Sequence, residues 1–357
     1  MRVAQVCPRY WPHIGGVETR VKEISRKLVE IGFEVEVLTT DPSGKLPKES
    51  VVKNVKIKRF KSWAPEEAFY FSKDLRNYLL KNSNDFDIVH THSYHAFPAL
   101  YASQAKGKNM LVFTPHYHGT GHTLIRSFLH IPYRLLGKKI FEKTDVIVCV
   151  SDYEKDLIKK HFDVNKKNLV VIPNGVNLED FKVLKKKKKN CRTILFVGRL
   201  EKYKGAQYLI LALPNLRDDI SLEIVGTGPY EKSLAELARK LCVENRVKFF
   251  RNLTRSELLE KYANADVFAL LSAHEAFGIC VAEALATKTP CILANTSGLN
   301  DWIDNENCFG VDFPIDVDKL VMLIAKVIGK EVNDVKLKDW NETVESLVGI
   351  YEDLINI

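Results

Sequence analysis

Two carboxylates on either side of one glycine are the residues of this sequence best suited to chemistry. Glu275 and Glu283 lie eight positions apart with Gly278 between them, and they follow the apolar run 266–271. The pattern predicts a strand, a short loop with one carboxylate, and a helix that begins about Ile279. The first turn of such a helix offers N–H groups to a phosphate, and each carboxylate can accept hydrogen bonds from hydroxyl groups. A ligand built from a sugar, a diphosphate, a ribose and a base fits this arrangement. Acidic residues near a helix start are also common simply because they stabilise it.

A pair of cations forms a second candidate site. Arg199 and Lys204 lie in the segment 197–205, which follows an apolar run and ends in a glycine where a helix is expected to begin. Two cations directed at one point suit a diphosphate. The alternative is that the pair only makes surface salt bridges. A later glycine-rich turn at 225–229 lacks the third glycine of a dinucleotide fingerprint and is weak evidence alone.

Glycines and histidines mark the first half of the chain. Gly15 and Gly16 precede an expected helix, where the backbone can approach a phosphate closely. Six of the ten histidines lie between positions 90 and 122, and they include two H-x-H pairs that begin at His90 and His116. In an extended segment both rings of such a pair share one face. We interpret these histidines as the lining of a sugar site.

A metal site is the alternative for the paired histidines. No nearby cluster of cysteines or carboxylates completes a ligand set, so we expect no metal. Metal-dependent sugar transfer could also use a D-x-D triplet, and the chain has two. The triplet that begins at Asp85 precedes an expected strand, which is the wrong end for a ligand site. The triplet that begins at Asp316 is expected to cap a helix.

Apolar strand-like runs alternate with helical segments along the whole chain, which predicts an α/β protein with parallel sheets covered on both faces. The expected strands lie near 2–6, 33–39, 55–60, 87–91, 110–114, 145–150, 168–172, 193–198, 221–225, 246–250, 266–271 and 290–294. The pattern restarts after the lysine run 185–189, which we interpret as a linker. We therefore expect two Rossmann-like domains whose parallel sheets face one another across a cleft. The candidate residues follow strands, and ligands of open parallel sheets bind there.

Size and composition are those of a globular protein. The chain has 357 residues, of which 46% are hydrophobic and 27% charged, with a net charge of +8. The seven cysteines are scattered without a C-x-x-C pair, which predicts reduced core residues. No apolar run reaches the length of a membrane span and no leader-like segment is visible, so a cytoplasmic location is expected. No aromatic residues interleave with the lysines, so we expect no nucleic-acid binding.

These motifs together resemble the retaining GT-B glycosyltransferases of family GT4, and the likeness covers nearly the whole chain. The matching segments, in order, are Gly15-Gly-Val-Glu18, Ile88-Val-His-Thr-His92, Phe113-Thr-Pro-His116, Ile172-Pro-Asn-Gly-Val176, Val197-Gly-Arg-Leu200 with Lys204-Gly205, Ile224-Val-Gly-Thr-Gly-Pro229, and the E-x7-E element from Glu275 to Glu283. The resemblance implies a GT-B fold with an acceptor domain at 1–177 and a donor domain at 178–340. A C-terminal helix at about 341–357 would complete the first domain.

The resemblance also implies a role for each candidate residue. Arg199 and Lys204 would hold the diphosphate, Glu275 the hydroxyls of the donor sugar, and Glu283 the ribose diol. His116 would lie by the reacting centre. The implied catalytic residues are His116, Arg199, Lys204 and Glu275, and the implied donor-binding residues are Gly15, Gly16, Gly198, Arg199, Lys204, Gly226, Glu275, Phe277, Gly278, Ile279 and Glu283. The segment 295–300 lacks the Gly-Gly often found there in the family.

The predicted function is transfer of a hexosyl unit from a UDP- or GDP-sugar to an acceptor hydroxyl, with retention and without a metal or other cofactor. The alternatives are a GT-B-shaped epimerase or hydrolase, and a non-catalytic two-domain protein that binds a sugar. The acceptor would be a saccharide or a lipid-linked molecule. The segment 124–143 mixes cations with a broad apolar face, so it could make peripheral contact with an anionic membrane or pack on its own sheet.

Overall fold

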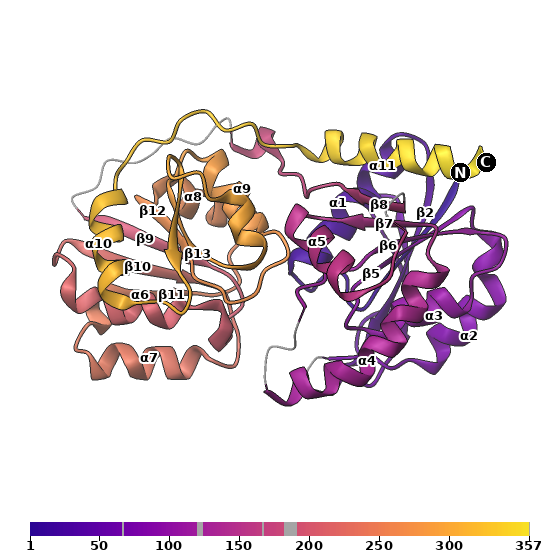
Figure 1. The fold of residues 1–357 in the computed structure, drawn as a ribbon, viewed down its shortest axis with the longest axis horizontal. Coiled ribbons are helices and arrows are strands. Elements are labelled where there is room, and N and C mark those ends of the chain that lie inside the picture. Colours follow the sequence, from indigo (N-terminus) through magenta and orange to yellow (C-terminus); the bar gives the residue numbers. More distant parts are fainter. Residues whose placement is uncertain (66–67, 120–123, 166–167, 182–190, 357) are drawn as a thin grey trace. The chain divides into compact units, whose positions relative to one another are not determined.

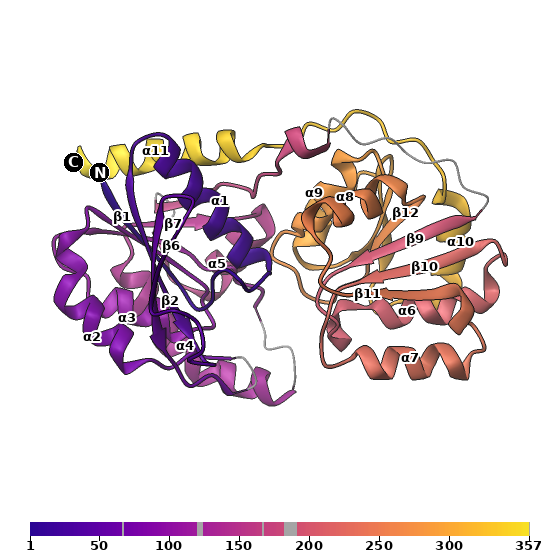
Figure 2. The ribbon, with the colours of Figure 1, turned by 180° about the vertical axis from the view of Figure 1, so that it is seen from behind.

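The computed structural model describes residues 1–65, 68–119, 124–165, 168–181 and 191–356, and for 124–132 it describes the backbone alone. The lysine run 185–189 therefore lies outside the described residues. The chain divides into a first unit, Met1–Gly175 with Trp340–Ile357, and a second unit, Val176–Asp339. Each unit is a sheet of mainly parallel strands flanked by helices (Figures 1 and 2), as predicted for a chain with two Rossmann-like domains.

The sheet of the first unit has eight strands in the order β3-β4-β2-β1-β5-β6-β7-β8. They are β1 (Arg2–Cys7), β2 (Glu34–Asp41), β3 (Glu49–Val52), β4 (Val55–Lys61), β5 (Ile88–His92), β6 (Met110–Thr114), β7 (Val146–Cys149) and β8 (Leu169–Val171). Only β3 is antiparallel to its neighbour within this described sheet. It was not predicted, because its hairpin turns through Lys53 and Asn54, both at positive φ (51° and 62°), without the usual Asn-Gly or Asp-Gly signal.

Helices cover this sheet and include one from the C-terminal end of the chain. They are α1 (Gly16–Glu30), α2 (Lys73–Asn82), α3 (Phe97–Gln104), α4 (Leu124–Lys143), α5 (Asp152–His161) and α11 (Trp340–Ile355). Figure 1 shows α11 beside α1, and both helices contribute to one buried cluster, with Ile24 and Leu28 from α1 and Val344 and Leu347 from α11. The C-terminal segment thus belongs to the first unit by burial of apolar surface.

The second unit has a fully parallel sheet in the order β11-β10-β9-β12-β13-β14. Its strands are β9 (Arg192–Val197), β10 (Ile220–Val225), β11 (Val247–Phe250), β12 (Val267–Leu270), β13 (Cys291–Asn295) and β14 (Cys308–Asp312), and its helices are α6 (Ala206–Ala212), α7 (Glu231–Lys240), α8 (Arg255–Asn264), α9 (Ile279–Ala286) and α10 (Val317–Val327). The first strand along the chain lies in the middle, so the strand order reverses between β9 and β12. Ligands of such sheets bind at this switch point.

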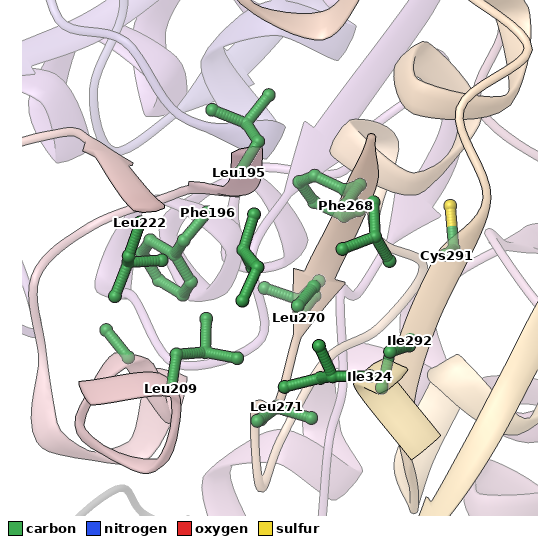
Figure 3. Packing of buried hydrophobic residues seen from close by; sticks show 14 of the residues in the cluster. Leu195, Phe196, Leu209, Leu222, Phe268, Leu270, Leu271, Cys291, Ile292 and Ile324 are labelled. Carbon is green, nitrogen blue, oxygen red and sulfur yellow. The ribbon is translucent and has the colours of Figure 1, made fainter. Parts of the chain in front are cut away.

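The core of the second unit shows why its sequence folds this way (Figure 3). Leu195 and Phe196 are neighbours on β9 and point to opposite faces of the sheet, yet both are fully buried. On β12, Phe268 and the adjacent Ala269 are fully buried as well. Strands whose side chains are buried on both faces need helices on both faces of the sheet. The two central strands, β9 and β12, are each followed by a loop at the same edge of the sheet.

Side-chain caps begin α5 and α10, and the one at Asp316 was predicted. The Ser151 hydroxyl accepts a hydrogen bond from the Glu154 N–H (3.1 Å) at the start of α5. The Asp316 carboxylate accepts bonds from the N–H groups of Asp318 and Lys319 at the start of α10. This D-x-D triplet is thus occupied with capping, as expected. Among the helices of the described residues, none combines the length and apolar character that crossing a membrane requires.

Candidate active site

A Lys–Glu ion pair occupies the switch point of the second unit. Strands β9 and β12 are hydrogen-bonded neighbours, so the loops that follow them meet at one edge of the sheet. There the Lys204 Nζ lies 2.5 Å from Glu275 Oε1. The Ser272 hydroxyl donates to the same oxygen at 3.1 Å. Two residues that the sequence places 71 positions apart are thus in direct contact.

The pair is largely buried and charged. The side chains of Lys204 and Glu275 are only 16% and 15% exposed. Burial alone would lower the pKa of Lys204, but the adjacent Glu275 carboxylate and the Tyr203 hydroxyl raise it above its ordinary range. An ion pair in such a place contributes little net stability, because desolvation offsets the attraction between the charges. The pair lies at the carboxyl ends of the strands, where ligands of open parallel sheets bind. A role in ligand binding therefore explains its position better than a contribution to the stability of the fold.

Two glycines bring the surrounding loops into contact. Gly205 has a φ of 83°, and a Cβ there would lie 2.2 Å from the carbonyl oxygen of Leu271. A Cβ at Gly226, where φ is 146°, would lie 1.9 Å from the carbonyl oxygen of Gly198. Both positions therefore require glycine for close packing of the backbone. Gly198 and Gly226 line the ends of β9 and β10, next to the loop that carries the cations.

The loop of Glu275 is fixed from the other side by the segment after β13. The Glu275 N–H donates to the Ser297 hydroxyl at 3.0 Å, and the Gly298 N–H donates to the Glu275 carbonyl at 2.9 Å. The ring of Phe277 packs edge-on against Trp302, whose indole N–H donates to the Phe277 carbonyl at 2.7 Å. Segment 295–300, which lacks the Gly-Gly often found in the family, thus supports the Glu275 loop through the Ser297 hydroxyl.

Helix α9 carries the second carboxylate. It begins at Ile279, as predicted, after Gly278 at a φ of 87°. Glu283 lies in α9 and is largely buried, with Arg255 of α8 paired to its carboxylate. Both glutamates therefore have a cationic partner, Lys204 for Glu275 and Arg255 for Glu283. The described unit brings together the strand, loop and helix that the sequence predicted.

Arg199 lies on the same loop as Lys204 but has a different carboxylate beside it. Its guanidinium is 3.0 Å from Glu201 Oε1, and its side chain is 39% exposed. An exposed ion pair of this kind contributes little to stability and exchanges its partner readily. Arg199 thus lies on the loop that follows β9, five positions before Lys204.

The histidines of the first unit form a buried network around the carboxyl end of β5. The His90 ring bonds the Tyr351 hydroxyl at 2.6 Å and the Thr114 hydroxyl at 2.8 Å, and the His92 ring bonds the Gln5 side chain at 2.7 Å. The His90 and His92 rings stack at 4.3 Å, so this pair shares one face as expected.

The second H-x-H pair does not form one face. His116 adopts a φ of 50°, so the segment is not extended there. Its ring lies 5.9 Å from that of His92, whereas the His118 ring stacks on His95 at 4.6 Å. Burial, together with the charge of Arg20, lowers the pKa of His116 to about 3, so its imidazole is neutral at physiological pH. Within the described part of the chain, no three His, Cys, Asp or Glu side chains are grouped to hold a metal ion.

The glycine pair lies at the start of α1. Gly16 begins the helix and Gly15 is its extended N-cap. The Glu18 carboxylate lies so close that a Cβ on Gly15 would be 2.3 Å from its oxygen, and Glu18 is paired with Arg9 at 2.9 Å. A Cβ at Gly15 would therefore require the Glu18 side chain to move from its place beside Arg9.

Glu154 holds the loop that carries His116. The sequence did not predict this role. The fully buried carboxylate of Glu154 accepts hydrogen bonds from the N–H of Tyr117 (2.6 Å) and from the N–H of Val150 (2.7 Å). Burial raises its pKa to about 7, against the lowering effect of those bonds and of Arg20. In the sequence it resembles any acidic residue in the first turn of a helix, so no local signal distinguishes it.

Glu154→Gln is expected to reduce kcat by about 10-fold without changing the affinity for a nucleoside diphosphate. A glutamine can accept only through its oxygen, and its amide group would oppose the second N–H. The His116 loop then loses its support, whereas the cations of the second unit are untouched. Steady-state kinetics and calorimetry measure the two effects. A variant that loses nucleotide affinity and turnover together would contradict this division.

The raised pKa of Glu154 also predicts a pH effect on stability. Between its unfolded value of 4.5 and about 7, the native state holds a proton that the unfolded state has lost. The free energy of unfolding should therefore fall as pH rises through this window. Urea unfolding of the wild type and of Glu154→Gln at pH 5 and pH 7.5 gives the comparison. The wild type should lose stability relative to the variant at the higher pH, and an equal change in both would show that Glu154 is not the cause.

Comparison with known proteins gives the family. The model described as "Glycosyltransferase Family 4" matches residues 14–180, and "Glycosyl transferases group 1" matches residues 177–345. An uncharacterised glycosyltransferase of Methanocaldococcus jannaschii is 28% identical over 392 residues, which cover 99% of this chain and 98% of the relative. A glycogen synthase of Mycobacterium tuberculosis is 28% identical over 359 residues, which cover 92% and 86%. The solved sucrose-phosphate synthase of Thermosynechococcus elongatus shares the fold, with a TM-score of 0.81, 19% identity and 99% coverage of both chains.

The chain therefore belongs to the GT-B glycosyltransferases of family 4. The two matched regions together span residues 14–345, so the membership rests on nearly the whole sequence. The predictions of the fold and of the family are confirmed. The protein is an enzyme of the glycosyltransferase class.

Proposed function

We propose that this glycosyltransferase transfers a hexosyl unit from a UDP- or GDP-sugar to an acceptor hydroxyl with retention of configuration. The observation that carries the proposal is the buried Lys204–Glu275 pair at the switch point, next to the start of α9 at Gly278. A cation beside a carboxylate suits a ligand whose anionic diphosphate adjoins a sugar rich in hydroxyls. The helix that follows carries Glu283 one turn further along, where a ribose would lie.

Each residue then has a distinct part in the reaction. Lys204 neutralises the charge that develops on the leaving diphosphate, and Arg199 of the same loop assists. Glu275 orients the donor sugar through its hydroxyls, and Glu283 accepts from the ribose diol. The neutral imidazole of His116 supplies a hydrogen bond near the reacting centre. The acceptor hydroxyl is held on the face of the sugar that the diphosphate leaves, so positioning and charge stabilisation replace a covalent nucleophile.

We propose a cytoplasmic protein and a saccharide or lipid-linked acceptor, with peripheral membrane contact through 124–143. The side chains of 124–132 lie outside the described residues. In the rest of α4, Ile140 and Phe141 are buried in the core, whereas Leu135 is 71% exposed. Flotation with anionic vesicles tests the contact, and protein that stays with the aqueous fraction would contradict it.

A donor screen tests the function directly. Purified protein is incubated with UDP-, GDP- and ADP-hexoses and a panel of saccharide acceptors, and nucleotide release is followed. We expect release that depends on the acceptor and is confined to UDP- or GDP-hexoses, with a product whose anomeric configuration by NMR matches the donor. An epimerase would alter the sugar without releasing nucleotide, and a hydrolase would release it without an acceptor. A binding protein would bind the donor and show no turnover.

Turnover is expected to persist after exhaustive EDTA treatment. The diphosphate has Lys204 and Arg199 as cationic partners, so charge neutralisation does not require a divalent ion. Rates are compared before and after EDTA, and after re-addition of Mn²⁺, Mg²⁺ or Zn²⁺. Loss of activity with EDTA that one of these ions restores would contradict the proposal and turn attention to the histidines around His92.

A further inference from the structure

A cation lies directly against the carboxylate assigned to the ribose. Arg255 is the first residue of α8, and its guanidinium NH1 pairs with Glu283 Oε1. On its other side, the Arg255 Nε lies 3.3 Å from Asp180 Oδ2, and the guanidinium sits 5.7 Å from the centre of the Phe181 ring. Arg255 therefore joins α9 to the segment with which the second unit begins.

Glu283 is more buried than Arg255, so its charge depends on the arginine for compensation. Its side chain is 12% exposed, compared with 42% for Arg255. A buried apolar cluster joins the elements that carry the pair, with Phe181, Leu259 of α8 and Ala282 of α9 among its members. Removal of one partner from such a pair leaves an uncompensated charge, which then changes its rotamer or takes up a proton. Either change would remove the orientation in which the carboxylate meets a ligand.

The Glu283 carboxylate can accept further hydrogen bonds while it is paired with Arg255. A carboxylate has about four lone-pair sites, and Arg255 occupies one oxygen. The remaining sites can accept from the two hydroxyls of a ribose while the ion pair with the guanidinium holds the carboxylate in one rotamer. Hydrogen bonds to an ionised acceptor are about twice as strong as neutral ones.

We propose that Arg255 is a positioning residue for the ribose of the donor, acting through Glu283. The inference rests on the proposed function, in which Glu283 accepts from the ribose diol. It adds that affinity for the ribose depends on a residue of α8 that does not itself touch the reacting atoms. It also links ribose binding to Asp180 and Phe181 at the start of the second unit.

The test compares ligands with and without ribose hydroxyls. UDP, GDP and their 2′,3′-dideoxy forms are titrated by calorimetry into the wild type, Arg255→Ala and Arg255→Lys. We expect Arg255→Ala to weaken the preferred ribonucleotide about 10-fold and its dideoxy form by less than about twofold. Arg255→Lys, which keeps the charge, should recover part of the loss. Lys261→Ala is the matched control, because Lys261 lies on the same helix and pairs with Glu223 at 3.1 Å.

The ligand pair separates positioning from a general structural effect. Equal weakening of ribonucleotide and dideoxynucleotide by Arg255→Ala would overturn the proposal, because a merely structural defect does not depend on the hydroxyls. Unchanged affinity for both would overturn it as well. Failure of the proposed function gives a different result, in which the wild type binds none of the four diphosphates. If the wild type binds ribonucleotide and dideoxynucleotide equally, Glu283 is not the ribose carboxylate, and the role of Arg255 falls with it.

Discussion

Replacement of Lys204 by alanine is expected to lower kcat/KM for the nucleotide sugar by at least about 10²-fold. The substitution removes the cation nearest to the expected diphosphate. It also leaves the Glu275 carboxylate, its partner at 2.5 Å, unpaired beside a second anion. The two effects act in the same direction, so the loss should exceed that of a single missing hydrogen bond.

The measurement is steady-state kinetics together with calorimetry of the nucleoside diphosphate. Affinity for the diphosphate should fall together with turnover, because Lys204 acts on the group common to donor and product. Lys202→Ala is a suitable control, since Lys202 is exposed and belongs to the same short turn as Lys204. Near-normal kinetics in a folded Lys204→Ala protein would remove Lys204 from the site.

Glu275→Gln should have the opposite effect on binding. Turnover is expected to fall by about 10²-fold or more, because the donor sugar loses its charged acceptor. Affinity for the free nucleoside diphosphate should stay the same or increase, because the Lys204 charge is no longer shared with a carboxylate. An increase would be the specific sign of the Lys204–Glu275 contact, since a loop carboxylate distant from the cation would leave binding unaltered.

Two readouts decide the Glu275 prediction. Calorimetry with the diphosphate and rates with the donor are measured on the same preparation, with Glu231→Gln as the control for loss of an ion-paired carboxylate elsewhere in the second unit. A Glu275→Gln protein that loses the diphosphate as strongly as Lys204→Ala would show that Glu275 serves to hold the loop. The Ser272 and Ser297 hydrogen bonds would then be its main contacts.

Features set by local sequence could be predicted. The start of α9 at Ile279, the cap at Asp316, and most of the buried strands of both sheets follow from spacing and residue type. Glu275 and Lys204 were recognised as candidates because each stands in a loop between a buried strand and a helix. Local patterns carry this information because capping and hydrophobic periodicity act within a few residues.

Contacts between distant parts of the sequence could not be predicted. The pairing of Lys204 with Glu275 depends on β9 and β12 becoming neighbours, which is a property of the strand order. Arg255 reaches Glu283 across 28 positions, and Glu154 reaches the backbone of Tyr117 across 37. Strand β14 was also missed, because its five residues contain a glycine and end in an aspartate, both rare in strands.

The most direct test of the central claim is a crystal structure of the protein with the nucleoside diphosphate that the donor screen selects. The account predicts phosphate oxygens within hydrogen-bonding distance of Lys204 and Arg199. It also predicts the ribose diol on Glu283, with Arg255 still paired to that carboxylate. A diphosphate bound away from the loops that follow β9 and β12, or a ribose without contact to Glu283, would contradict the account.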